Sequence, residues 1–276
     1  MKEITGTTRL MGILADPILQ VKTPQRMNEL LQRLGYDGIL VPMHTRAENL
    51  TEVVAGLRKI ENLAGVIVTV PHKTAVLALC DDASPATRLI GAANVVRRDP
   101  DGRLTATMLD GEGFVRGLVQ AGVSLMGKTA YLAGAGGAAN AIAFSLLAAG
   151  VARLTIGNRT AARAQDVQQR VAQLYPDADV RVGTNDPSGH DLVINATSLG
   201  MADGDPLPLD VTRLQPEQLV CEIIMQPADT ALLKAAQARG CRIHYGAPML
   251  ACQIELMAEF LGVTRDAATP SQAAPR

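Results

Sequence analysis

A glycine-rich turn near the middle of the chain has the residue types that a phosphate-binding turn needs. The segment 134–139, Gly-Ala-Gly-Gly-Ala-Ala, follows an apolar stretch at 129–133 and opens into a run of small residues with helical character. In this context the first glycine permits a tight turn, the second lets the backbone approach a pyrophosphate, and a small third residue allows close helix packing. An ordinary glycine turn is the alternative. The flanking segments favour dinucleotide binding at the helix N-terminus, by Gly134, Gly136, Gly137 and Ala138.

The residues after the next predicted strand indicate which dinucleotide binds. Enzymes that use NAD usually place Asp or Glu there to hydrogen-bond the ribose 2′-hydroxyl. This chain instead has Gly157-Asn158-Arg159-Thr160, with Arg163 one turn further on. The Arg159 guanidinium can pair with a 2′-phosphate and stack on adenine. The sequence therefore predicts NADP as the cofactor, the alternative being that Arg159 is a solvated surface residue.

Lys73 is the candidate for proton transfer, because it follows a predicted strand end and a proline in the segment 69–73. Hydride removal from an alcohol also requires loss of a proton from the oxygen, and a lysine accepts it when neighbours or burial lower its pKa. Taken alone, such a lysine is more often a surface charge. Asp110 could orient Lys73 and share its proton, although a helix N-cap explains this aspartate equally well. Asn94, after a run of small residues, adds an amide.

The elements that must position these residues alternate between strands and helices. In the first half, the apolar pattern predicts strands at 9–15, 38–42 and 64–70, and helices at 24–34 and 48–60, the first ended by Gly35. In the second half it predicts strands at 129–133, 152–156, 191–195 and 219–224, and helices after the glycine turn, at 160–174 and at 249–261. This alternation predicts parallel α/β structure. The tail after Asp266 is expected to be disordered.

Composition narrows the class of protein. The 276 residues suit two domains, and 47% apolar with 19% charged residues argues against global disorder. A formal charge of -1, with both signs mixed, does not fit a nucleic-acid binder. Neither cysteines nor histidines show metal-ligand spacing, so we expect free thiols in a reducing cytoplasm and no metal. We also expect neither a signal peptide nor a membrane span.

Taken together, the motifs resemble shikimate dehydrogenase from about Gly12 to Gly262. No single motif is decisive, but their order along the chain is specific. The matching segments are DPI at 16–18, KTP at 22–24, TVPHK at 69–73, GAANVV at 91–96, DGEGF at 110–114, GAGGAA at 134–139, NRT at 158–160, NATSLGM at 195–201 and GAPML-A-C-Q at 246–253.

The resemblance implies a fold and a reaction. It implies an α/β substrate domain at 1–108, completed by the C-terminal helix 248–265, and a Rossmann-type, doubly wound parallel-sheet domain at 109–247 that binds NADP, with the active cleft between them and a tail at 266–276. The implied reaction is reversible hydride transfer between NADP and a small cyclic hydroxy acid, shikimate, in the chorismate pathway of aromatic amino acid biosynthesis. Monomer and homodimer both fit this family, which has neither nucleic-acid nor membrane partners.

The resemblance also implies roles for individual residues. Lys73 and Asp110 match the catalytic pair. The positions that match substrate contacts are Thr23, Thr69, Asn94 and Gln253. The positions that match cofactor contacts, beyond the glycine turn, are Asn158, Arg159, Thr160 and Arg163 around the phosphate, and Thr197, Ser198, Gly246 and Met249 towards the nicotinamide.

Several positions depart from the family pattern, and they concern the substrate. Val21 and Thr23 replace two serines that bind the substrate carboxylate, so one hydroxyl is lost. Losing a hydrogen bond to a charged group costs about 1.5–3 kcal/mol, roughly a tenfold to hundredfold loss of affinity, unless Gln20 or Lys22 supplies another donor. Other departures are Ile67 for Asn, Met108-Leu109 for Asn-Thr, Glu222 for Asp and Met225 for Tyr. They predict a more apolar pocket and altered or weakened specificity.

Three other interpretations stay open. A quinate/shikimate dehydrogenase using NAD is opposed by Asn158-Arg159-Thr160. A catalytically inactive NADP-sensing regulator is opposed by the retention of Lys73 and Asp110. An unrelated NADP enzyme, such as a methylenetetrahydrofolate dehydrogenase, fits the segment 69–73 loosely but does not fit 246–253.

Overall fold

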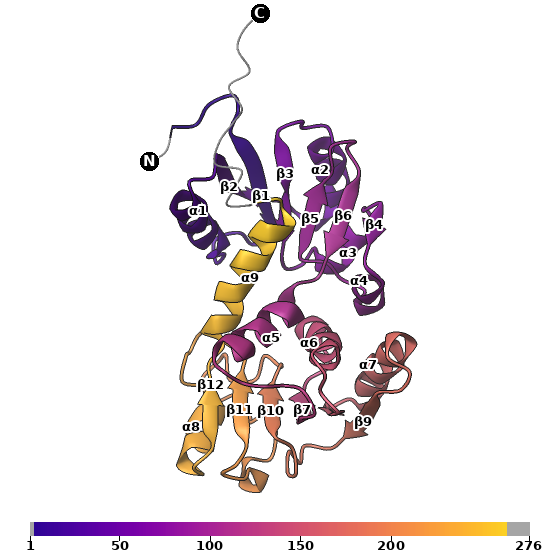
Figure 1. Ribbon diagram of the computed structural model, residues 1–276, viewed down its shortest axis with the longest axis vertical. Coiled ribbons are helices and arrows are strands. Elements are labelled where there is room, and N and C mark those ends of the chain that lie inside the picture. The colour runs from indigo at the N-terminus through magenta and orange to yellow at the C-terminus, as the bar shows by residue number, and fades with distance from the viewer. Residues whose placement is uncertain (1–2, 264–276) are drawn as a thin grey trace, which may run out of the picture. The chain divides into compact units, whose positions relative to one another are not determined.

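The computed structural model describes residues 3–263 (Figure 1). The chain divides into two compact units, one from the described parts of Met1–Leu109 and Ile254–Arg276, the other from Asp110–Gln253. Helix α9 (Ala247–Phe260) runs across this division in the sequence. The tail after Asp266, for which we expected disorder, lies outside the described residues.

The first unit contains a six-stranded mixed sheet. Its strand order is β2-β1-β3-β5-β6-β4, and β2, β1 and β3 are parallel, as predicted. Strand β5, which the sequence pattern did not predict, runs antiparallel to both β3 and β6. The short link between β5 and β6, residues 99–103 with Gly102 at φ 83°, accounts for the antiparallel pairing of these two strands, because a parallel pair needs a crossover of a dozen or more residues. The strands are β1 (Arg9–Ala15), β2 (Gly38–His44), β3 (Leu63–Val68), β4 (Asp82–Ala83), β5 (Val95–Arg98) and β6 (Leu104–Thr107).

The helices of the first unit follow the predicted apolar pattern. Helix α1 (Thr23–Leu34) buries Met27, Leu30 and Leu31. It ends at Gly35, whose N–H donates to the Gln32 carbonyl and whose φ of 68° is a left-handed conformation that favours a residue without a side chain. The segment predicted as one helix at 48–60 is a 3₁₀ turn, η1 (Ala47–Asn49), followed by α2 (Leu50–Leu57). The two short helices that sequence analysis did not predict are α3 (Lys73–Leu77) and α4 (Pro85–Ile90).

The second unit contains a six-stranded, fully parallel sheet. The order is β12-β11-β10-β7-β8-β9, so that β7 to β12, counted one to six along the chain, stand in the 3-2-1-4-5-6 order of dinucleotide-binding sheets. The strand order reverses between β7 and β10. The strands are β7 (Thr129–Ala133), β8 (Arg153–Gly157), β9 (Asp179–Gly183), β10 (Leu192–Asn195), β11 (Leu219–Glu222) and β12 (Arg242–His244).

The helices of the second unit approach one another closely through small residues. A Cβ added to Gly111 in α5 (Asp110–Gln120) would lie 2.1 Å from the Ala141 carbonyl oxygen of α6 (Gly137–Ala148). Only glycine therefore fits where these helices pack. The remaining elements are α7 (Ala161–Leu174), a 3₁₀ turn η2 (Val211–Arg213) and α8 (Ala231–Ala238).

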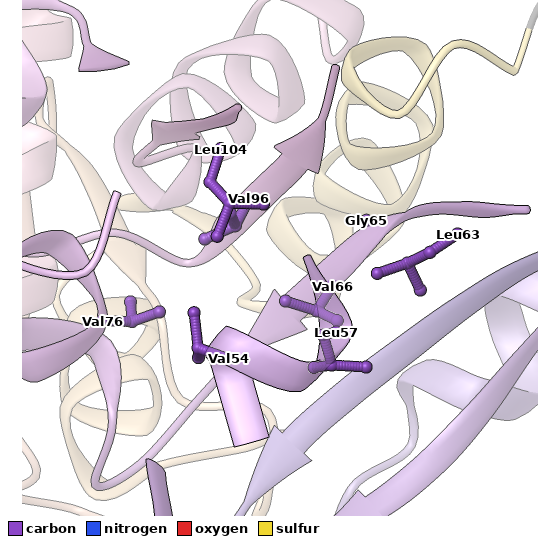
Figure 2. A pocket seen from close by; sticks show the side chains of 8 residues that line it. All are labelled: Val54, Leu57, Leu63, Gly65, Val66, Val76, Val96 and Leu104. Carbon is purple, nitrogen blue, oxygen red and sulfur yellow. The ribbon is translucent and has the colours of Figure 1, made fainter. Parts of the chain in front are cut away.

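The core of the first unit contains a small apolar gap beneath α2. Its volume is about 10 Å³, and Figure 2 shows the side chains that surround it. A gap of this size with only apolar walls stays dry, so it belongs to the packing of the core and holds no ligand. The lining residues are Val54, Leu57, Leu63, Gly65, Val66, Val76, Val96 and Leu104.

Enlarging this gap should destabilise the first unit. Leu104 is 3% exposed, so Leu104→Ala removes buried methyl groups beside an existing void and should lower the free energy of unfolding by about 2–5 kcal/mol. Urea unfolding followed by circular dichroism measures the change. Leu19→Ala, at a side chain that is 93% exposed in the same unit, is the control and should leave stability within about 0.5 kcal/mol. An equal loss of stability in Leu104→Ala and Leu19→Ala would contradict this account of the core.

Candidate active site

The candidate substrate residues of the first unit gather at one edge of its sheet. The parallel strands β1, β2 and β3 end at this edge, and β5, running the other way, begins there. Thr69 follows β3 and its N–H donates to the Leu14 carbonyl (3.1 Å), while Asn94 precedes β5 and its carbonyl accepts from Val68 N–H (2.8 Å). The Lys73 carbonyl accepts from Ala93 N–H (2.8 Å). The structure therefore brings together the backbone segments that carry Thr69, Lys73 and Asn94.

Lys73 is the first residue of α3 and is half-buried. The preceding residue, His72, is buried, and its Nε2 lies 2.7 Å from the Thr45 carbonyl oxygen. Its backbone N–H donates to the Thr69 carbonyl (2.9 Å). His72 therefore fixes the turn that leads from the strand to the lysine, and the sequence motif around it combines a structural histidine with the candidate catalytic lysine.

Asn94 supports the backbone next to the candidate catalytic aspartate. This side chain is buried, and its Oδ1 accepts a hydrogen bond from Leu109 N–H (2.9 Å). Leu109 is covalently followed by Asp110, so Asn94 holds the chain one residue before it. Sequence reasoning assigned Asn94 only to a substrate hydroxyl and did not predict this contact.

The altered positions of the first unit differ in their surroundings. Thr23 is the half-buried first residue of α1, and Val21, also half-buried, closes a turn by donating its N–H to the Ile18 carbonyl (3.2 Å). Ile67 instead pairs with Ile13 and Val95 inside the sheet and is buried. Ile67 therefore belongs to the core, whereas Val21 lies in the loop before α1.

Asp110 and Gln253 form a buried pair in the second unit. Asp110 begins α5, and Gln253 lies in α9 at the end of the unit's sequence. Gln253 Nε2 donates to Asp110 Oδ1 (3.2 Å), and both side chains are buried. A Cβ on Gly113 would lie 2.4 Å from Gln253 Cγ, so this glycine makes room for the pair. Sequence analysis predicted both residues as site residues but not their contact.

The glycine turn has the geometry that phosphate binding requires. Gly134 has a φ of 117°, and a Cβ there would lie 2.8 Å from the Ala196 carbonyl oxygen. Gly136 precedes α6 without a side-chain cap, and a Cβ on Gly136 or Gly137 would meet nothing within 4 Å. Ala139, at the third fingerprint position, is fully buried. The turn thus leaves the N–H groups of a twelve-residue helix uncapped by side chains, with no acid in its first turn.

The residues after β8 form a cationic patch at the start of α7. Asn158 Nδ2 donates to the Thr160 carbonyl (2.8 Å), and Thr160 precedes the helix without capping it by its side chain. Arg159 and Arg163 are exposed, and within residues 3–263 neither makes an ion pair. The first turn of α7 contains no acid. Two guanidinium groups and a helix N-terminus can therefore bind a dianionic phosphate.

The loops after β10 and β12 contain the remaining candidate cofactor residues. The Thr197 hydroxyl donates to Asn195 Oδ1 (2.7 Å) and accepts from Leu199 N–H (3.0 Å), so it shapes its own loop, whereas Ser198 is exposed. Gly246 is buried where a Cβ would lie 2.5 Å from the Ile224 carbonyl oxygen, and Met249 follows in α9. Thr197 therefore acts as a positioning residue in this loop.

The most buried charged residue at the carboxyl edge of the second unit's sheet was not among the predicted site residues. Glu222 ends β11 and was noted only as a replacement for Asp. Burial raises its pKa, although hydrogen bonds from neighbouring donors oppose the shift. Burial also lowers the pKa of His244, which ends β12. The signal available in the sequence was a single acidic residue inside the apolar run 219–224.

No helix within residues 3–263 combines the length and apolarity of a membrane span. In the same part of the chain, no three His, Cys, Asp or Glu side chains come together as a metal site. All four cysteines are free, and three of them are buried.

Comparison with known proteins assigns both units to one family. Residues 13–96 match the model of the shikimate dehydrogenase substrate-binding domain, and residues 118–199 match that of shikimate/quinate 5-dehydrogenase. The shikimate dehydrogenase (NADP(+)) of Rubrobacter xylanophilus is 39% identical over 95% of this chain and 94% of its own length.

Two solved structures share the fold. The shikimate 5-dehydrogenase of Listeria monocytogenes, in complex with shikimate and NAD, has a TM-score of 0.88 and 31% identity, covering 97% of each chain. The 5-ketofructose reductase of Gluconobacter sp. strain CHM43, in its ligand-free form, has a TM-score of 0.84 and 31% identity, covering 95% of this chain and 98% of its own.

The arginine patch should determine nucleotide preference. Replacing Arg159 by Ser removes a charge-assisted hydrogen bond, so the Kd for NADP should rise about tenfold to hundredfold while that for NAD changes little. Isothermal titration calorimetry with both nucleotides measures this. Arg181→Ser, at an exposed arginine of β9 paired with Asp179, is the control and should alter neither Kd. An equal loss of affinity for NADP and NAD in Arg159→Ser would show that Arg159 does not contact the 2′-phosphate.

Proposed function

Because the chain belongs to the shikimate dehydrogenase family, we propose that it is an NADP-dependent oxidoreductase that interconverts shikimate and 3-dehydroshikimate. The observation that carries this proposal is the parallel 3-2-1-4-5-6 sheet, in which an uncapped glycine turn follows β7 and two arginines without an ion pair to any residue of 3–263 follow β8. These are the requirements for a dinucleotide with a 2′-phosphate. Membership of the family supports shikimate as the substrate.

The residues present fit NADP. The open space over Gly136 and Gly137 suits the pyrophosphate, and Arg159 and Arg163 suit the 2′-phosphate. Bound NADP would supply the hydride acceptor. We assign the nucleotide to 109–247, and the substrate to 1–108 completed by 248–265.

The chain's own residues then handle the proton and the orientation of the substrate. We assign Lys73 as the base that takes the proton from the reacting hydroxyl as the carbon loses its hydride, and returns it in the reverse direction. We assign Asp110 as the partner of this lysine, as the family resemblance implies. Gln253, bonded to Asp110, and Asn94 would hold substrate hydroxyls, and Thr69 and Thr23 would contact the remaining polar groups.

A second candidate substrate is a related compound with fewer polar groups. Val21 offers no hydroxyl to a carboxylate, and Met225, where the family has Tyr, is exposed and apolar. The Gluconobacter relative is named as a reductase of 5-ketofructose, at the same 31% identity as the Listeria enzyme. These observations favour a hydroxy acid of lower polarity, or an uncharged hydroxy ketone, as the better substrate.

The proposal extends to the compartment and the oligomeric state of the enzyme. Four free thiols fit a reducing compartment, and we propose a cytoplasmic enzyme. We propose a monomer or a homodimer, as the family resemblance implies.

A spectrophotometric assay at 340 nm tests the proposed function. The wild type should reduce NADP with shikimate, and Lys73→Met should lower kcat about 10²–10⁴-fold, the usual contribution of general acid–base catalysis. Lys59→Met, at an exposed lysine of the same unit, should keep full activity. Preference for NAD with quinate would favour the quinate/shikimate alternative. NADP binding without turnover of shikimate, quinate or 5-ketofructose would favour a regulator.

Restoring the missing hydroxyl should improve carboxylate binding. Val21→Ser adds one donor, so the KM for shikimate should fall about tenfold with little change in kcat. Leu19→Ser, which adds a hydroxyl at an exposed position of the same loop, should leave KM unchanged. An unchanged KM in Val21→Ser would remove the argument that the carboxylate is weakly bound.

A further inference from the structure

The carboxylate of Glu222 is completely buried at the carboxyl end of β11, with an exposed fraction of 0%. It accepts hydrogen bonds from Asn195 Nδ2 (3.1 and 3.0 Å to its two oxygens) and from Thr230 Oγ1 (3.0 Å). It also accepts from the backbone N–H groups of Ile223 (2.9 Å) and Ile224 (3.1 Å). Three of these partners are N–H groups that can only donate, and the fourth is a hydroxyl, so the arrangement suits a carboxylate.

These hydrogen bonds join three segments at the carboxyl edge of the sheet. Asn195 connects Glu222 to the loop after β10. Its Nδ2 also donates to the Leu199 carbonyl (3.1 Å), and its Oδ1 accepts from Thr197 N–H (3.0 Å). Glu222 directly holds the backbone of the β11 loop. Gly246, at the start of α9, packs against the same loop at Ile224. The buried carboxylate therefore links the loop at 196–200 with the loop at 223–225 and, through Thr230, with the start of α8. The segment 245–246 packs on the second of these loops.

These two loops and the segment 245–246 belong to one half of the nucleotide-binding sheet. A dinucleotide lies across the point where the strand order reverses, with one mononucleotide on each half. Arg159 follows β8, which assigns the 2′-phosphate and adenosine to the β7-β8-β9 half. The two loops that Glu222 joins follow β10 and β11, and the segment that packs on them follows β12. All three remain for the nicotinamide nucleotide.

We propose that Glu222 is a positioning residue for the nicotinamide half of the cofactor, acting through the loops that it joins and not through contact with the adenosine half. The proposal rests on the proposed function, since it requires a nicotinamide dinucleotide. It predicts that loss of the carboxylate disturbs binding of the nicotinamide and hydride transfer while binding of the 2′-phosphorylated adenosine is retained.

The test compares two ligands that differ in the nicotinamide. NADPH and 2′,5′-ADP, which lacks the nicotinamide nucleotide, are titrated by calorimetry into the wild type, Glu222→Gln and Glu222→Asp. Gln has the same size but turns an amide N–H₂ towards donors, so the Kd for NADPH should rise about tenfold and kcat should fall about 10- to 100-fold. The Kd for 2′,5′-ADP should stay within about twofold. Asp restores the charge and should bring the Kd for NADPH within about threefold of the wild type.

A matched variant separates positioning from stability. Gln218 is a buried amide just before β11, at the opposite end of the strand, and its Nε2 donates to the Pro187 and His190 carbonyls (2.8 Å each). Gln218→Leu should lower the melting temperature as Glu222→Gln does, yet leave both Kd values and kcat unchanged.

Three results would overturn the proposal. The first is an equal loss of affinity for NADPH and 2′,5′-ADP in Glu222→Gln. The second is an unchanged Kd for NADPH in that variant. The third is a selective loss of NADPH affinity in Gln218→Leu as well. If the wild type binds NADPH but does not oxidise shikimate, the proposed substrate fails while the ligand comparison still decides the role of Glu222.

Discussion

Parallel strands present all their carboxyl ends at the same edge of a sheet, and in both units the side chains capable of chemistry follow those ends. In the second unit the glycine turn, the arginine patch and the loop containing Thr197 each come directly after a strand of a fully parallel sheet. In the first unit Thr69 and Lys73 follow β3, and Asn94 reaches the same edge only because β5 is antiparallel. Strand direction therefore determines which residues meet.

Close backbone approach is the second requirement, and glycines provide it at specific points. Gly111 lets α5 lie against α6, Gly134 lets the turn after β7 approach the loop after β10, and Gly246 lets the start of α9 pack on the loop after β11. A Cβ at each would lie within 2.8 Å of a carbonyl oxygen. Because a displacement of about 1 Å can cost a hundredfold in rate, these contacts matter for function as well as packing.

The exposure of each charged or polar residue fits the role proposed for it. Arg159 and Arg163 are exposed, as suits cations that attract a phosphate from solution. Asp110, Asn94 and Glu222 are buried and hydrogen-bonded to neighbouring chain segments. Buried polar groups with every partner satisfied hold one arrangement of the backbone, which is what a hydride-transfer site requires.

Local sequence pattern determined the elements whose signals are local. The strand 129–133 and the end of the first helix at Gly35 were predicted to the residue, because an apolar run and a left-handed glycine depend on few neighbours. The glycine turn and the missing acid after β8 likewise indicated a 2′-phosphorylated dinucleotide. The strands that were missed are β4, β5, β6, β9 and β12. Among them β9 is polar and β12 has three residues, and their pairing depends on distant strands. Only the tertiary structure decided that Gln253 bonds Asp110, 143 positions apart, that Ile67 is a core residue, and that Glu222 joins the loops after β10 and β11. Such contacts depend on how the chain packs, because residues far apart in the sequence meet only in the folded structure.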